Sequence, residues 1–211
     1  MRVLIAFEQS GEMRRAFRNL GFDAYSVDLL ESVDNSPQHI VGDAWDEIGT
    51  GKYDLIVMHP TCTALCCSGN RYYGSGKPKH ADRLAAMDYT RRLWEHAKKH
   101  AYCVALENPV GVLPKVIGPA TQYVQPWQFG HGEVKRTGFW LHNLPALTPT
   151  DIVDGRHPAV WLASPSADRW KIRSKTYSGI AAACAAQWGA ALVDTLTDMA
   201  DMYTSENEVV A

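Results

Sequence analysis

Hydrophobic residues along this chain gather in short, unbroken runs that alternate with amphipathic stretches. The runs show no polar alternation, which indicates strands buried on both faces, as in a parallel sheet. They occupy residues 2–7, 24–27, 39–41, 55–58 and 101–106. Residues 12–20 and 82–100 carry apolar side chains at helical spacing. The alternation of strands and helices predicts an α/β fold with a mostly parallel sheet.

The C-terminal part is less regular. Residues 128–141 resemble two strands around a polar turn, and residues 177–202 have a strong helical composition. Residues 112–126 and 143–172 show little pattern, and we expect the tail at 205–211 to be frayed. Ser10 precedes the first helix and is its expected cap.

The run at 55–58 ends abruptly at His59 and Pro60. Because Pro60 has no backbone donor, the strand cannot continue, and the chain leaves the sheet at its carboxyl end. Open α/β folds bind their ligands at that edge. Cys62 follows two residues later and is therefore a candidate nucleophile, although most free cysteines are simply small buried residues.

Acidic residues follow other predicted strands. Asp28 lies about twenty residues after the Glu8–Gly11 turn, a spacing typical of a carboxylate that accepts from a ribose hydroxyl. Gly11 alone makes a poor glycine motif, so a solvated strand end is an equal alternative for Asp28. Asp43 and Glu107 occupy similar positions. These strand ends predict a pocket for a nucleoside-containing cofactor, and they bring Glu107 near Cys62.

The net charge and the cysteine content limit the classes of function that suit this chain. A net charge of −2 and a pI near 6.4 argue against strong non-specific binding to the phosphate backbone of a nucleic acid. Residues 70–81 nevertheless interleave basic side chains with Tyr72 and Tyr73, which suits nucleic acid or a nucleotide, or a solvated loop. Five cysteines without a secreted spacing predict reduced thiols and a cytoplasmic protein. We expect no membrane span and no metal, since Cys62, Cys66 and His59 lack a second ligand pair.

The ordered set of these segments resembles the cytosine-C5 DNA methyltransferases, in a short form such as phages carry. The matching segments are residues 7–11 for FxGxG, Gly42-Asp43 for GD, 62–69 for PCQxFSxxG, Glu107-Asn108-Pro109 for ENV, 129–137 for YGVPQxRxR and 177–183 for YRQIGNAVP. Thr61, Thr137 and Ala182 depart from the family pattern. Residues 140–172 form a reduced, irregular insert that leaves no room for an ordinary target-recognition domain. The chain, 1–211, is therefore predicted as a single domain.

The resemblance implies a Rossmann-like S-adenosylmethionine-dependent methyltransferase fold, mostly parallel with an antiparallel strand and with helices on both faces. It implies methyl transfer to C5 of cytosine in DNA, with Cys62 adding to C6 and Glu107 holding the N3/N4 edge. The implied catalytic residues are Cys62, Glu107, Asn108, Lys135 and Arg136. The implied cofactor contacts are Phe7, Glu8, Gln9, Ser10, Gly11, Asp28, Leu29, Asp43, Ala44, Pro60 and Ala182.

The reduced insert leaves the acceptor open. A single DNA strand, a free cytosine nucleotide, or a duplex presented by a protein partner that supplies target recognition would each suit the chain, because base flipping in a duplex needs contacts that offset its cost. A non-catalytic protein that binds S-adenosylmethionine or nucleic acid is the alternative from another class. Retention of Cys62 and Glu107 argues against it.

Overall fold

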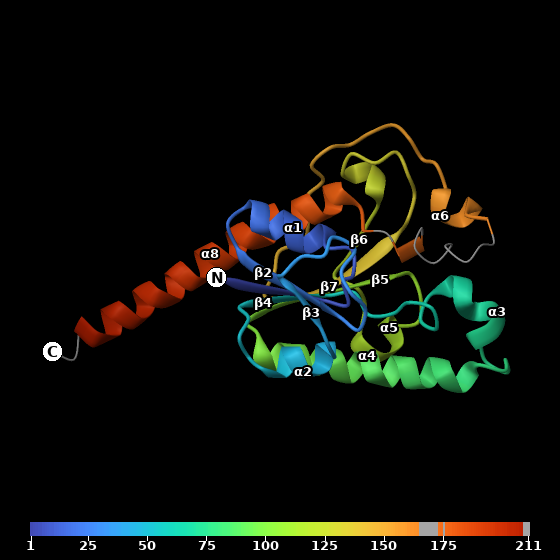
Figure 1. Ribbon diagram of the computed structural model, residues 1–211, viewed down its shortest axis with the longest axis horizontal. Helices are drawn as coiled ribbons and strands as arrows, with labels where there is room; N and C mark the ends of the chain where they lie inside the picture. The colour runs from blue at the N-terminus through green and yellow to red at the C-terminus, as the bar shows by residue number, and fades with distance from the viewer. Residues whose placement is uncertain (165–172, 175, 209–211) are drawn as a thin grey trace.

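The computed structural model describes residues 1–164, 173–174 and 176–208. Within them, seven strands form one sheet in the order β3-β2-β1-β4-β5-β7-β6 (Figure 1). The strands are β1 Arg2–Ala6, β2 Asp23–Asp28, β3 His39–Val41, β4 Leu55–Met58, β5 Cys103–Pro109, β6 Gln122–Val124 and β7 Thr137–His142. Strands β1 to β5 pair in parallel, whereas β7 is antiparallel to both β5 and β6.

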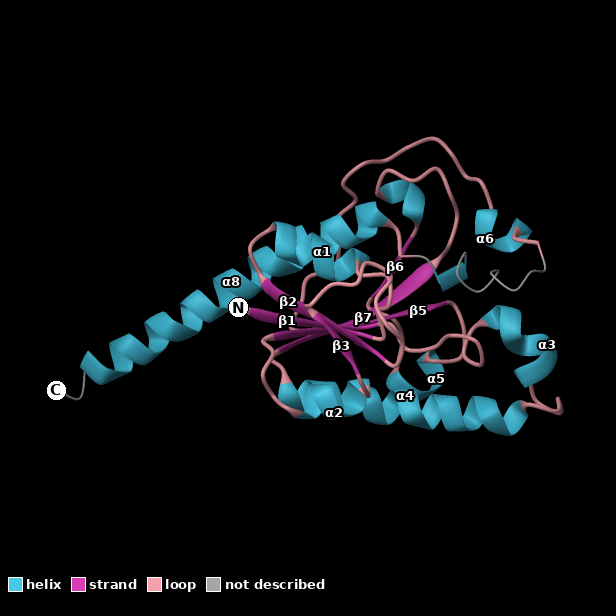
Figure 2. Cartoon of the chain, viewed as in Figure 1, coloured by secondary structure: helices cyan, strands magenta, loops and turns pink. Residues whose placement is uncertain are grey.

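Helices cover both faces of this sheet (Figure 2). Helices α1 (Glu12–Asn19) and α8 (Ser178–Glu208) lie on one face, and α2 (Ala44–Gly49) and α4 (His80–His100) lie on the other. Successive β1 side chains point to opposite faces, so Val3 packs with the first helix layer and Leu4 with the second. The predicted Rossmann-like α/β fold, with an antiparallel strand and two helical layers, is confirmed.

Shorter elements complete the described chain. They are α3 Asn70–Tyr73, α5 Pro114–Ile117, α6 Ala159–Leu162 and the 3-10 turns Cys67–Gly69 and Pro126–Gln128. The first strand of the predicted pair at 128–141 was misplaced, since it lies at Gln122–Val124 and the chain then turns at Pro126. Part of the predicted irregular insert and the end of the predicted tail lie outside the described residues.

Helix α8 packs along the face that carries α1 and then projects past the sheet (Figure 1). By length and composition alone, its stretch Ser178–Asp198 would be able to cross a bilayer. Ile180, Trp188 and Leu192 of this stretch are buried in the core. Their burial accounts for the apolar composition of α8 as that of a core helix.

Candidate functional site

The carboxyl ends of β4 and β5 bring two candidate side chains together. The pairing of Met58 with Leu106 places the next residues, His59 and Glu107, side by side. His59 Nδ1 lies 3.1 Å from Glu107 Oε2, and the two side chains are 12% and 19% exposed. Glu107 was expected just past its strand, but pairing with β7 extends β5 through this residue. The side chain still lies at the carboxyl edge.

Asn108 has a structural part at this edge. It is fully buried, and its Nδ2 donates to the Pro60 carbonyl at 2.9 Å. This bond ties the loop after β4 to the end of β5, so Asn108 positions the loop. The implied catalytic role of Asn108 stays a prediction, since its buried Oδ1 has no hydrogen-bond partner among the described residues.

Two opposing influences set the state of Glu107. Burial raises the pKa of its carboxyl group, but the His59 hydrogen bond and the charge of Lys135 outweigh burial, and the pKa lies below its usual value. Glu107 is therefore an ionised hydrogen-bond acceptor at neutral pH.

Cys62 begins a tight turn that places a second thiol beside it. The Leu65 and Cys66 backbone N–H groups both donate to the Cys62 carbonyl, at 3.0 and 2.9 Å. The hydrogen bond with Cys66, burial and the charge of Glu107 raise the pKa of the Cys62 thiol. The protein at rest therefore keeps Cys62 as a thiol.

Cys66 is the more acidic of the two thiols. Hydrogen bonds from the Cys62 thiol, from Ser68 and from a backbone N–H outweigh burial and lower the pKa of Cys66 to about 5. Cys66 Sγ lies 2.9 Å from Ser68 Oγ, which accepts from Arg173 Nη2 at 2.6 Å. The sequence motif pointed only to Cys62, because the neighbours that acidify Cys66 follow from the fold.

A pocket opens beside Glu107 at the carboxyl edge of the sheet. Its lining combines polar side chains with apolar ones from both helices of one layer. The lining residues are Met13, His59, Glu107, Lys135, Thr137, Phe139, Thr176, Tyr177 and Ile180. Tyr177 is fixed there by a 2.6 Å hydrogen bond from its hydroxyl group to Glu133 Oε2.

The two basic residues before β7, Lys135 and Arg136, lie in different surroundings. Lys135 lines the pocket, and its charge acts on both Glu107 and Cys62. Arg136 is exposed and its guanidinium lies 4.4 Å from the centre of the Tyr123 ring, on β6. The structure therefore brings Lys135 to the site and does not bring Arg136 to the pocket.

The ends of β2 and β3 carry side chains suited to an adenosine. Asp28 Oδ1 accepts from the Leu30 backbone N–H at 3.0 Å, and Leu29 is strongly exposed. Asp43 is exposed and caps α2, accepting from the Trp45 backbone N–H at 2.9 Å. In each case one carboxylate oxygen takes the backbone bond, and the second oxygen is available to a ribose or an amine.

The turn after β1 has a different character. Glu8 is buried, and its carboxylate accepts from the Met13 and Arg14 backbone N–H groups at 2.6 and 3.1 Å. Glu8 therefore caps α1, whereas Ser10 was the expected cap and contributes only a 3.3 Å bond from the Glu12 N–H. Both carboxylate oxygens of Glu8 therefore already accept backbone bonds, and the implied cofactor contact of Glu8 stays a prediction.

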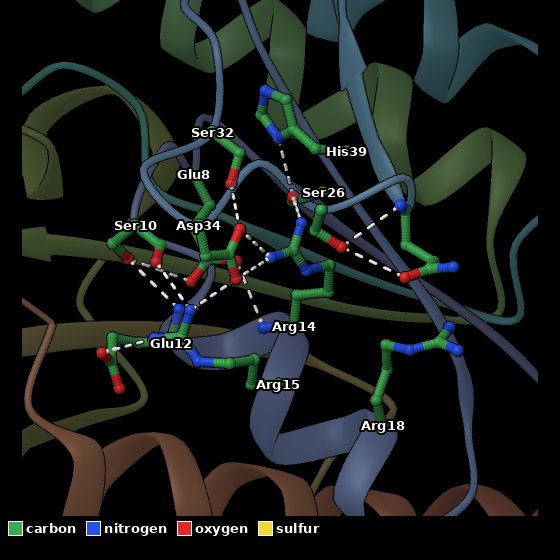
Figure 3. A network of polar contacts seen from close by, with 12 residues as sticks. Glu8, Ser10, Glu12, Arg14, Arg15, Arg18, Ser26, Ser32, Asp34 and His39 are labelled. Atoms are coloured by element: carbon green, nitrogen blue, oxygen red, sulfur yellow. Dashed lines mark hydrogen bonds and ion pairs between the residues drawn. The ribbon is translucent and has the colours of Figure 1, made fainter.

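A salt-bridge network covers this turn (Figure 3). Arg14 is buried; its Nη1 donates to Ser26 Oγ at 3.1 Å and its Nη2 to Asp34 Oδ1 at 2.6 Å. Arg15 Nη1 binds the other oxygen of Asp34 at 2.6 Å. A side chain on Gly11, which has φ of +71°, would collide with Arg14 and Asp34. The space beside Gly11 is therefore filled by protein atoms, a feature that the sequence motif did not predict.

The remaining cofactor candidates are distributed unevenly. Phe7 and Gln9 are partly exposed in the turn after β1, while Ala44 and Pro60 are buried. Ala182 is exposed on α8 and does not line the pocket, so the structure does not bring it to the site. Among the described residues, no cluster of three or more metal-ligating side chains occurs.

No family model and no curated protein matches this chain. Among solved structures, it is similar to the methyltransferase EhMeth of Entamoeba histolytica, with 12% identity, a TM-score of 0.48, and coverage of 72% of this chain and 57% of that one. The bifunctional kinase-methyltransferase WbdD is 16% identical, with a TM-score of 0.45 over 70% of this chain and 36% of that one. The S. pombe Dnmt2 methyltransferase is 14% identical, with a TM-score of 0.42 over 69% and 51%. The chain thus spans between about a third and three fifths of these proteins, and at this distance the likenesses carry no information about substrate or reaction.

Proposed function

We propose that this protein transfers a methyl group from S-adenosylmethionine to C5 of cytosine in DNA. One observation carries the proposal: the parallel pairing of β4 with β5 sets Glu107 beside the start of the loop that carries Cys62, and Lys135 lines the same pocket as Glu107. A nucleophile, a hydrogen-bond acceptor and a cation thus meet at the ends of neighbouring strands. Glu107 and Lys135, but not Cys62, line the pocket, whose mixed polar and apolar lining suits a pyrimidine ring.

C5 of cytosine is a poor nucleophile, and addition of a thiolate to C6 activates it. In the proposed reaction, Cys62 gives its proton to a solvent base as its sulfur adds to C6, because the Cys66 thiolate is too weak a base to take it. Lys135 stabilises the negative charge that develops on the ring. The bound sulfonium cofactor supplies the methyl group. Loss of the C5 proton to a base then expels Cys62.

Glu107 would orient the ring. Its ionised carboxylate accepts a hydrogen bond from the exocyclic amine at N4 and would repel the O4 atom of uracil. The Asn108 bond to the Pro60 carbonyl keeps the loop that carries Cys62 against the end of β5. These contacts would favour cytosine and hold its C6 near the thiol.

The cofactor fits this edge in part. Asp28 and Asp43 would hold the ribose and the adenine amine, and Leu29 and Phe7 would pack against the adenine. The methionine end would approach the turn at Gly11, where Arg14 and Asp34 fill the space in this structure. Binding there would require these two side chains to move.

Nucleoside mass spectrometry tests the proposal. Purified protein would be incubated with isotope-labelled S-adenosylmethionine and, separately, duplex DNA, single-stranded DNA or dCMP. We expect 5-methylcytosine with at least one acceptor and its loss in Cys62→Ser. Full activity of that variant would reject the covalent mechanism, and absence of 5-methylcytosine with every acceptor would reject the function.

Two observations favour a non-catalytic binding protein as the second candidate. The raised pKa of Cys62 disfavours its thiolate, and the space beside Gly11 is filled. Titration calorimetry separates the candidates: binding of S-adenosylmethionine or DNA by a protein that forms no methylated product would support the second.

A further inference from the structure

His59 occupies a junction between the two halves of the candidate site. Its backbone N–H donates to the Ala6 carbonyl at 3.0 Å, which continues the ladder between β4 and β1. Its ring contacts Glu107 through Nδ1, and it lies near enough to the buried Glu8 to oppose in part the rise that burial causes in the pKa of that carboxyl group. Lys135, just before β7, interacts electrostatically with Glu107, the residue that the His59 ring contacts. The charged groups around the ring are therefore Glu8, Glu107 and Lys135.

The imidazole ring uses its two nitrogens differently. Nδ1 holds Oε2 of Glu107, so Oε1 is the oxygen through which Glu107 can accept a bond from a ligand. Nε2 is buried and makes no hydrogen bond within the described part of the chain. Since His59 lines the pocket and is nearly buried, its orientation is set by Glu107 and by packing.

We propose that His59 is a specificity-determining positioning residue: by holding Oε2 of Glu107, it presents Oε1 as an acceptor and makes the pocket select a 4-amino pyrimidine over a 4-oxo pyrimidine. The inference rests on the proposed function and extends it to a residue outside the motifs. A protonated Glu107 would act as a donor and accept a 4-oxo ring equally well, so removal of His59 relaxes the choice. The loss of one hydrogen bond to a charged group predicts a drop of about 10- to 100-fold in the preference.

The test compares His59→Leu, which removes the donor, with His59→Asn, whose side-chain amide keeps a donor near the position of Nδ1. The measured quantity is kcat/KM for single-stranded oligonucleotides that contain one cytosine or one uracil. We expect the cytosine-to-uracil ratio to fall about 10- to 100-fold in His59→Leu and to be largely rescued in His59→Asn. The acid limb of the pH–rate profile should move to higher pH in His59→Leu, because the pKa of Glu107 loses the hydrogen bond that lowers it. An unchanged ratio would overturn the inference.

A matched control is His142→Leu, at the opposite end of β7, where His142 pairs with Val104. We expect its ratio and pH profile to equal those of the wild type. If the wild-type protein methylates no acceptor, duplex DNA and dCMP included, the proposed function fails, and the carboxyl carbon of Glu107, titrated by NMR, then tests the contact by itself. A higher titration midpoint in His59→Leu than in wild type supports the holding role of His59, and an equal midpoint overturns it.

Discussion

Replacing Asp34 with Asn tests whether the network in Figure 3 anchors the turn after β1. Arg14 is only 1% exposed, and its partner Asp34 is 27% exposed. Asp34 lies in the loop between β2 and β3, whose Val33 N–H also donates to the Gln9 carbonyl at 3.0 Å. The substitution keeps the size of the side chain and removes its charge, so the buried guanidinium loses its counter-ion.

Breaking a buried ion pair by removing one partner costs about 3–5 kcal/mol. Asp34 is partly exposed, so water offsets some of this loss, and we expect about 2–3 kcal/mol in the free energy of unfolding. For a chain of this length, that corresponds to a fall of roughly 5–10 °C in Tm. Urea unfolding followed by tryptophan fluorescence measures the same quantity independently.

The pH dependence supplies a second readout. The hydrogen bonds and charges of Arg14 and Arg15, with a bond from Ser32, outweigh partial burial and hold the pKa of Asp34 well below its usual value near 4. A depressed pKa contributes stability that is present above the unfolded-state value and is lost as the pH falls below it. The stability difference between wild type and Asp34→Asn should therefore shrink as the pH falls below about 4.

Asp88→Asn is the matched control for this prediction. Asp88 also binds two arginines, Arg91 and Arg92, but all three side chains are about half exposed. Exposed pairs contribute little to stability, so we expect no measurable change in the unfolding midpoint. If Asp34→Asn were as stable as Asp88→Asn, the buried network would not stabilise the fold, and the reasoning from the burial of Arg14 would be refuted.

One labelling experiment and one further substitution test the site and the core. The pKa of Cys66 is lowered to about 5, so we expect its alkylation by iodoacetamide to rise with pH through about 5. Cys62, whose pKa is raised, should stay largely unmodified at neutral pH. Peptide mass spectrometry measures both thiols, and faster alkylation of Cys62 than of Cys66 would contradict this assignment. Trp188 is fully buried against Phe139, with the two ring centroids 5.4 Å apart, so Trp188→Ala should lower the free energy of unfolding by about 3–5 kcal/mol; a loss below 1 kcal/mol in urea unfolding would contradict its place in the core.

The sequence predicted well those elements whose burial produces a recognisable local pattern of hydrophobic residues. Strands β1 and β4 are unbroken apolar runs because both faces of the sheet are covered, and α4 is long enough to show its period. Helix α2 has six residues, too few for a helical period, and its Asp43 cap was interpreted only as a strand end. Strand β6 has three residues and follows from pairing with β7, which no local pattern encodes.

In the candidate site, too, the sequence predicts some features and not others. The positions of Cys62 and Glu107 follow from where β4 and β5 run, and turn residues such as Pro60 mark those places in the sequence. Their protonation follows from partners far along the chain: His59 acts on Glu107 across 48 residues, and Arg173 reaches Ser68 across 105. A motif specifies which atoms are present, whereas burial and neighbouring charges decide which of them carry protons. For this reason the sequence selected Cys62 as the candidate nucleophile, and only the fold shows that Cys66 is the more acidic of the two thiols.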